Sequence, residues 1–278
     1  MNRTARLVTV LAVAAALLST AGCNKLKARD QLNKGVQSFR SANYEEAIGH
    51  FQNAVNLDKD LKVAKMYLAT AYAQQYVPGV ETPENLRNAQ LAIDEYKQVL
   101  ASDPHNVTSL KGIAFLYMQQ KKFDDAREYY KKAIDADPND PETYYSVGVI
   151  DWTEAYQPRM KLRQELQLKS DDPIKDKKAC ETLKQQNWPY VQDGIDVLNK
   201  AMHLRPDYDD AMAYMNLMYR EKADIECDDP AARSQDLQTA EQWVDKTLAT
   251  KKAKAAKQPQ NQGITLDNQG NSQQQPTQ

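Results

Sequence analysis

Glycine is scarce in this chain, and its few copies lie far apart. The 278 residues include only 9 glycines, and no two of them are closer than seven positions. Phosphate-binding loops, dinucleotide-binding fingerprints and the GxSxG turn of serine hydrolases all need glycines within a few residues of one another. The sequence therefore excludes these three kinds of site.

Histidine and cysteine are also scarce, with 3 copies of each. His50, His105 and His203 are far apart, and none has a second metal ligand at helical spacing, so no metal site is predicted. Neither Cys180 nor Cys227 has a neighbouring histidine that would make it a nucleophile. The 36 Lys+Arg are matched by 38 Asp+Glu, which argues against a basic nucleic-acid binder. We predict no catalytic residue and no cofactor.

Long apolar runs are missing except near the start of the chain. Arg3 and Arg6 precede the run from Leu7 to Leu18, and small residues follow it. The run of about twelve residues is too short to span a bilayer, which needs roughly 20. The pattern predicts an export signal over residues 1–22.

The signal ends in Thr20-Ala21-Gly22-Cys23, which resembles the lipobox of bacterial lipoproteins, although leucine is commoner where Thr20 stands. The resemblance implies that the thiol of Cys23 receives a lipid. A cleaved, soluble periplasmic protein is the alternative. Asn24 stands where aspartate favours inner-membrane retention in enteric bacteria, so the resemblance indicates an outer-membrane anchor facing the periplasm.

Two amphipathic stripes fill the segment from Val107 to Asp140, and a lysine pair separates them. Their members are Leu110, Ile113, Ala114 and Tyr117, then Phe123, Ala126, Tyr130 and Ala133. Asp137-Pro138 ends the second stripe, because proline cannot continue a helix. This unit of roughly 34 residues resembles the tetratricopeptide repeat.

The same pattern recurs at residues 28–61, 62–106, 107–140, 141–208 and 209–250. Lys34, Ser38, Asp151 and Asn216 depart from the residues that the family prefers. The resemblance implies an all-α, right-handed superhelical solenoid of about five helix-turn-helix repeats, spanning residues 23–250. A Gln/Asn-rich tail over 251–278 has little to bury and is predicted to be disordered.

Repeats 2, 4 and 5 carry insertions. These are Val77 to Arg87, Gln157 to Trp188 and Asp228 to Thr239. Each interrupts the turn between the two helices of its repeat, so the extra chain is expected along one edge of the array. Immediately after the second insertion, Pro189 is expected to restart a helix.

Two acidic pairs stand before prolines, at Asp171-Asp172-Pro173 and Asp228-Asp229-Pro230. They are interpreted as helix caps rather than as paired catalytic carboxylates. Cys180 and Cys227 belong to the same edge, and an exported chain meets an oxidising compartment, so we predict a disulfide between them. Two separate buried thiols are the alternative.

In the tetratricopeptide family, a second stripe on the first helix of each repeat lines a concave groove. The residues here that correspond to it are Leu32, Val36, Phe39, Met66, Lys111, Phe115, Met118, Tyr145, Val149, Trp152, Leu217 and Arg220. Most are apolar, which favours a hydrophobic or aromatic-containing partner segment. The Lys and Asn clamp of some members is missing, because Leu32 and Val36 stand where it would begin. Alternatively, these side chains belong to the core.

The sequence thus predicts a lipid-anchored, non-catalytic scaffold or adaptor of the bacterial envelope, which binds other proteins through its groove and its insertion-bearing edge. An accessory lipoprotein of outer-membrane protein or pilus assembly is a narrower alternative. An enzyme that uses the insertion of repeat 4 is a remote one. Lys25, Lys27 and Arg29 either contact anionic lipid headgroups or are simply solvated.

Overall fold

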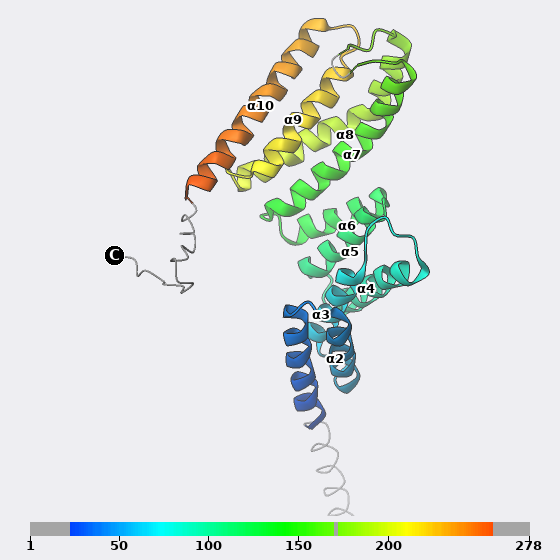
Figure 1. Cartoon of the computed structure of the whole chain (residues 1–278), viewed down its shortest axis with the longest axis vertical. Helices are drawn as coiled ribbons and strands as arrows, with labels where there is room; N and C mark the ends of the chain where they lie inside the picture. Colours follow the sequence, from blue (N-terminus) through cyan, green and yellow to red (C-terminus); the bar gives the residue numbers. More distant parts are fainter. Residues whose placement is uncertain (1–22, 170–171, 258–278) are drawn as a thin grey trace, which may run out of the picture. The chain divides into compact units, whose positions relative to one another are not determined.

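The computed structural model describes residues 23–169 and 172–257, and every regular element in these ranges is a helix. Figure 1 shows the helices as successive antiparallel pairs. The all-α prediction is confirmed. The predicted signal segment and most of the predicted tail lie outside the described residues. Within them, no helix is both long and apolar enough to cross a membrane.

Ten helices form five hairpins in the described residues, one for each predicted repeat. A helix over 23–40 precedes α2 (Tyr44–Leu57), α3 (Lys62–Gln75), α4 (Pro83–Ser102), α5 (Val107–Gln119), α6 (Phe123–Ala136), α7 (Pro141–Glu165), α8 (Lys177–Leu204), α9 (Asp209–Asp224) and α10 (Pro230–Lys257). The chain divides into two compact units, of which unit 1 ends at Thr153 and unit 2 begins at Glu154. Helix α7 starts in unit 1 and ends in unit 2.

Large side chains in unit 1 pack against glycines. A Cβ atom added to Gly35 would lie 2.5 Å from the ring of Phe51, and one added to Gly112 would lie 2.5 Å from the ring of Tyr96. Both rings are buried. In both contacts, a glycine on one helix and an aromatic ring on a neighbouring helix allow the two helices to lie close together.

Short polar caps set several helix ends in unit 1. The Asn106 side chain accepts the N–H of Ser109 at 3.0 Å at the start of α5. Thr82 accepts the N–H of Asn85 at 3.3 Å at the start of α4, whose first residue is Pro83. Helix α6 ends at Ala136, immediately before Asp137-Pro138, as predicted.

Most of the described residues of the insertions are helical. Among the described residues at these three turns, only 76–82, 166–169, 172–176 and 225–229 lie outside the helices. The other inserted residues lengthen α4, α7, α8 and α10. In unit 2 the extra chain therefore makes longer hairpins rather than long loops.

The prediction that Pro189 restarts a helix is wrong, because this proline lies inside α8. The helix begins at Lys177, where the Asp176 side chain accepts the N–H of Ala179 at 2.9 Å. A buried stripe of Cys180, Leu183, Asn187, Val191, Gly194 and Leu198 continues past the proline at helical spacing. Burial of this stripe outweighs the backbone hydrogen bond that a proline removes.

The two acidic pairs behave differently from each other. Asp229 accepts the N–H groups of Ala231 at 3.1 Å and Ala232 at 2.9 Å, and it caps α10, which starts at Pro230 as predicted. No helix starts at Pro173, so the first cap is wrong. The Asp172 carboxylate instead accepts the N–H of Lys169 at 2.9 Å and folds the 166–176 loop.

Helix α10 continues to Lys257, so the boundary predicted for the tail, residue 251, is too early. Lys254 lies 2.5 Å from Asp209 at the start of α9, and Thr250 contacts the sulfur of Met212. These contacts hold the last two turns of α10 against α9. The remaining residues of the predicted tail are outside the described chain.

Candidate interaction surfaces

Unit 1 contains a hollow of about 520 Å³ between helices α3, α4, α5, α6 and the first turns of α7. It is lined by Thr70, Ala73, Gln74, Tyr76, Pro78, Tyr96, Lys111, Gly112, Phe115, Tyr130, Glu142 and Ser146. Phe115 is the most exposed ring in this lining, with 46% of its surface accessible. We call this hollow the unit 1 groove. A small apolar side chain of a partner fits such a space.

The only cation in this lining, Lys111, is already paired. Its Nζ lies 2.5 Å from a carboxylate oxygen of Asp140. Burial alone raises the pKa of Asp140, but the hydrogen bonds from Lys111 and from the Thr143 hydroxyl outweigh it and hold this pKa below its ordinary value. The Lys111–Asp140 pair is therefore neutral overall, so Lys111 offers little attraction to a carboxylate.

Hydroxyl groups in the groove are paired and neutral. Thr70 donates to the carbonyl of Met66 at 2.8 Å, so the Tyr96 hydroxyl, 3.0 Å from Thr70, donates to the Thr70 oxygen. Burial raises the pKa of Tyr130 to about 12, against a hydrogen bond with Ser146 that lowers it. Both phenols thus stay protonated at neutral pH and present an apolar ring with a satisfied hydroxyl.

Asp151 departs from the family pattern, and its partner explains why. This side chain is fully buried and forms an ion pair with Arg127 of α6. A charge at a position that is usually aromatic is therefore compensated by a cation on the preceding helix.

Unit 2 contains a buried cluster of charged side chains that joins α7, α9 and α10. The cluster consists of Arg159, Arg163, Glu221, Asp224 and Arg233, and we call it the arginine cluster. One Asp224 oxygen lies 2.8 Å from Arg163 and 3.1 Å from Arg159, and the other lies 3.8 Å from Arg233. Glu221 lies 2.8 Å from Arg159.

Arg163 also fixes the loop between α7 and α8. It donates to the carbonyl of Asp172 at 3.1 Å and to that of Lys169. Its side chain is only 4% exposed, so it pairs with Asp224 and folds the 166–176 loop within one buried site. A buried arginine needs several acceptors at once, and this loop supplies two of them.

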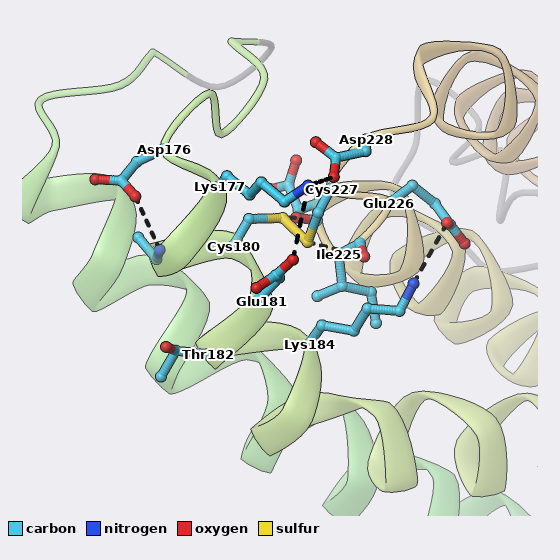
Figure 2. The surroundings of a disulfide bond; sticks show 12 residues. Asp176, Lys177, Cys180, Glu181, Thr182, Lys184, Ile225, Glu226, Cys227 and Asp228 are labelled. Carbon is cyan, nitrogen blue, oxygen red and sulfur yellow. Dashed lines mark hydrogen bonds and ion pairs between the residues drawn. A yellow bond between two sulfur atoms is a disulfide. The ribbon is translucent and has the colours of Figure 1, made fainter.

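The structure contains the predicted disulfide between Cys180 and Cys227, whose Cα atoms are 5.5 Å apart. Figure 2 shows ion pairs on both sides of it, from Lys177 to Asp228 and from Lys184 to Glu226, the latter at 3.7 Å. The first turns of α8 are thereby held against the loop that joins α9 to α10. The second and third insertions lie beside each other at this point.

A second hollow, of about 730 Å³, lies in unit 2 beside the arginine cluster. Arg220 lines it and forms an ion pair with Glu241. The hollow contains three arginines, Arg159, Arg163 and Arg220, and all of them have carboxylate partners. Its polar lining differs from the aromatic lining of the unit 1 groove.

Residues 86–147 match the family model described as tetratricopeptide repeat. The matched residues cover less than a quarter of the chain, and the five hairpins repeat the same helix-turn-helix unit through the described residues. The chain has the tetratricopeptide-repeat fold. None of the curated proteins compared with it matches its sequence.

Solved structures with the same fold as this chain include several of MamA. One, a crystal structure of MamA, is 12% identical and covers 84% of this chain and 96% of its own, with a TM-score of 0.55. MamA from Desulfovibrio magneticus RS-1, from residue 41 to its end, is 17% identical to this chain. It covers 82% of this chain and 96% of its own, with a TM-score of 0.55. A MamA RS-1 double mutant is 16% identical to this chain and covers 83% of this chain and 97% of its own, with a TM-score of 0.56. At these identities the likeness concerns the fold alone.

The predicted groove residues of this chain fall into three sets. Lys111 and Phe115 line the unit 1 groove, and Arg220 lines the hollow of unit 2. Leu32, Val36, Phe39 and Met66 are partly buried and pack against the core of unit 1, as the alternative interpretation expected. The partly buried remainder, which lines neither hollow, comprises Met118, Tyr145, Val149, Trp152 and Leu217.

Sequence analysis missed the arginine cluster of this chain. Arg159 and Arg163 stand four residues apart, which places them on one face of α7, and Glu221 and Asp224 are three apart on α9. This spacing is the one available signal. Among the described residues, no group of three His, Cys, Asp or Glu side chains has the arrangement of a metal site.

Proposed function

We propose that this protein is a lipid-anchored, non-catalytic scaffold of the bacterial envelope, and that its unit 1 groove binds an apolar segment of another protein. The exposed ring of Phe115 in a hollow lined mainly by aromatic and uncharged side chains is the observation that carries the proposal. Tetratricopeptide arrays generally bind other proteins through such surfaces. An aromatic side chain left accessible inside a hollow is the kind of residue that anchors a partner.

The lipid anchor is supported by the position of Cys23. This cysteine is exposed and lies in the helix over 23–40. Ala28, five residues later, is already fully buried. Five residues extend at most about 18 Å, so a lipid on Cys23 would keep unit 1 close to the membrane surface. The Cys180–Cys227 disulfide suits an oxidising compartment such as the periplasm. We place the anchor in the outer membrane, facing the periplasm.

The anchor is tested with the Cys23→Ser variant. Wild-type protein should fractionate with membranes and incorporate a fatty-acid probe, whereas Cys23→Ser should do neither. A Cys180→Ser, Cys227→Ser variant, which keeps Cys23, is the matched control and should still be labelled. Soluble, unlabelled wild-type protein would refute the anchor.

The groove is tested with Phe115→Ser. Trp152, which family offsets also predicted to contact a partner but which lines neither hollow, is tested separately with Trp152→Ala. Loss of an aromatic anchor should weaken partner binding by more than about 2 kcal/mol without loss of helicity. The measurement is recovery of partner after affinity purification from detergent-solubilised membranes, with circular dichroism of each variant. Because Trp152 is half buried, a loss of helicity in Trp152→Ala would assign that residue to the core. Full recovery of the partner by folded Phe115→Ser would remove the groove from the proposal.

A further inference from the structure

The inserted loop between α3 and α4, residues 76–82, has a fixed shape. Val80 donates its N–H to the carbonyl of Val77 at 3.3 Å across a tight turn. Gly79 has φ of +78°, and Pro78 precedes it. Proline then glycine, with positive φ at the glycine, is the signature of a type II turn. The loop lies between α3 and α4 in Figure 1.

The buried side chain of Asn85 forms hydrogen bonds to the backbone of this turn. Its side chain is 6% exposed; it accepts the N–H of Val77 at 2.7 Å and donates to the carbonyls of Val77 at 2.8 Å and Val80 at 2.6 Å. A single buried amide thus makes three hydrogen bonds to one exposed turn. The chain therefore fixes the position of the side chains that the turn carries.

Those side chains are apolar and accessible. Val77 is 53% exposed, Val80 is 41% exposed and Leu86, at the start of α4, is 44% exposed. Single exposed aliphatic residues are ordinary, but three of them within ten positions on a rigid turn are not. Tyr76 and Pro78 of the same segment line the unit 1 groove together with Phe115. The inserted loop therefore contributes Tyr76 and Pro78 to one wall of that groove, and Val77 and Val80 belong to the same turn.

The charges around this surface are mainly negative. Segment 76–87 carries Glu81 and Glu84 against Arg87, all exposed. The groove itself adds Glu142, while Lys111 and Asp140 neutralise each other. With these four carboxylates and two cations, the surface carries a formal charge of 2 − 4 = −2. An acidic segment would be repelled here, and a lysine or arginine would be attracted to the carboxylates and to the exposed aromatic ring.

We propose that the inserted loop 76–82 and the unit 1 groove form one docking surface for a segment of another protein that combines apolar side chains with lysine or arginine. This inference rests on the proposed function and specifies its partner. The apolar side chains of the segment contact Val77, Val80, Leu86 and Phe115. Its basic residues lie beside Glu81, Glu84 and Glu142.

The test is a selection from a random 12-residue peptide library displayed on phage, against the full chain purified in detergent with its disulfide intact. Selected peptides should contain more Lys and Arg than Asp and Glu, with apolar residues between them. Recovery of these phage should fall at least tenfold on Val80→Ser, Leu86→Ser protein and on Phe115→Ser protein. It should fall about fivefold on Glu81→Gln, Glu84→Gln protein. Leu248→Ser, which changes an exposed leucine of unit 2, is the matched control and should retain the phage.

The outcomes separate the two proposals. Selection of acidic peptides, or recovery by the Val80→Ser, Leu86→Ser protein equal to that of the wild type, would overturn the loop proposal. If the loop proposal were overturned but Phe115→Ser still abolished phage recovery, the proposal that the groove binds a partner segment would remain supported. If no selected phage depended on Phe115, both the loop surface and groove binding would be refuted. Unchanged circular dichroism in the loop variants is required in every arm and is expected, because both side chains are exposed.

Discussion

The two units bury different chemistry. In unit 1, Asp151 is the one charged residue among the buried side chains of the described chain, and the remaining interior is apolar or uncharged. In unit 2 the buried set includes Arg163, Glu221, Asp224 and Asp236. Unit 1 follows the regular repeat closely, whereas unit 2 carries two of the three insertions. Added chain at a repeat turn has thus introduced a polar interior that its own arginines must neutralise.

The difference matters because buried charges depend on one another. Replacing a whole buried ion pair by apolar residues is often neutral, but removing one partner leaves an uncompensated charge. Apolar packing has no such dependence, because truncating one apolar side chain loses only the free energy of its own burial and of the cavity that it leaves. Unit 2 should therefore respond more sharply than unit 1 to a single change at its interior.

The largest effect is expected for Asp224→Ala. This change removes the shared partner of Arg159, Arg163 and Arg233, so unit 2 should lose about 3–5 kcal/mol of stability. The measurement is hydrogen exchange read by mass spectrometry, which reports protection of α8 to α10 separately from α3 to α6. Lys177→Ala, which breaks an exposed ion pair nearby, is the control and should leave the protection of α8 to α10 unchanged. Equal loss of protection in α3 to α6 would contradict the comparison.

Loss of the disulfide should have the next largest effect. The bond joins residues separated by 47 positions, and closing a loop of that length restricts the unfolded chain by about 4 kcal/mol, an upper value because strain reduces it. Chemical denaturation of oxidised and reduced wild-type protein, with the Cys180→Ser, Cys227→Ser variant alongside, measures the difference. Two alkylated thiols at Cys180 and Cys227 in protein taken directly from the envelope and not reduced would show that the bond is absent there.

A smaller and pH-dependent effect is expected in unit 1 from Tyr130. Its folded pKa of about 12 lies above the ordinary value of 10.0, so the folded state retains the proton more tightly than the unfolded state. The resulting stability is fully present below pH 10 and is lost as the pH rises through 12. Two pKa units correspond to about 2–3 kcal/mol. Denaturation midpoints between pH 9 and pH 12 measure this loss, and Tyr130→Phe should flatten their dependence on pH. An unchanged slope in that variant would exclude Tyr130 as its source.

Much of unit 1 could be predicted from its residues. Leu110, Ile113 and Ala114 are all buried as their spacing predicted, and the Asp137-Pro138 pair ends α6. These features are local, because a stripe and a proline act within a few turns of one helix. The aromatic rings that meet Gly35 and Gly112 come from neighbouring helices, so a stripe within one helix does not specify these contacts.

The interior of unit 2 could not be predicted in the same way. Pro189 was expected to begin a helix on local grounds, yet the buried stripe of α8 passes through it. Arg163 meets Asp224 across 61 positions, and nothing in either local sequence specifies that pairing. The disulfide was predicted because two cysteines remained, because the repeat placed both on the same edge of the array, and because the compartment was inferred; none of these arguments concerns the packing of α8 against α9.

The groove was predicted in part for a similar reason. Family offsets correctly led to Lys111 and Phe115, but the same offsets also led to Leu32, Val36, Phe39 and Met66, which pack against the core. The position of a residue along a helix determines the direction of its side chain, but it does not determine whether a neighbouring helix buries that side chain. The wall formed by the inserted loop has no counterpart in the repeat, so only the hydrogen bonds of Asn85 reveal it.

The disulfide between Cys180 and Cys227 also closes a covalent ring that contains residues 180–227. Every residue of α9, and all of α8 beyond its first turn, lies inside the covalent ring that the bond closes. A protease that cuts once anywhere between residues 181 and 226 therefore releases no fragment, and the nicked protein keeps its mass until it is reduced. The part of unit 2 that carries Glu221 and Asp224 is thus tethered on both sides of any single cut, and its helices can pack again in place after cleavage.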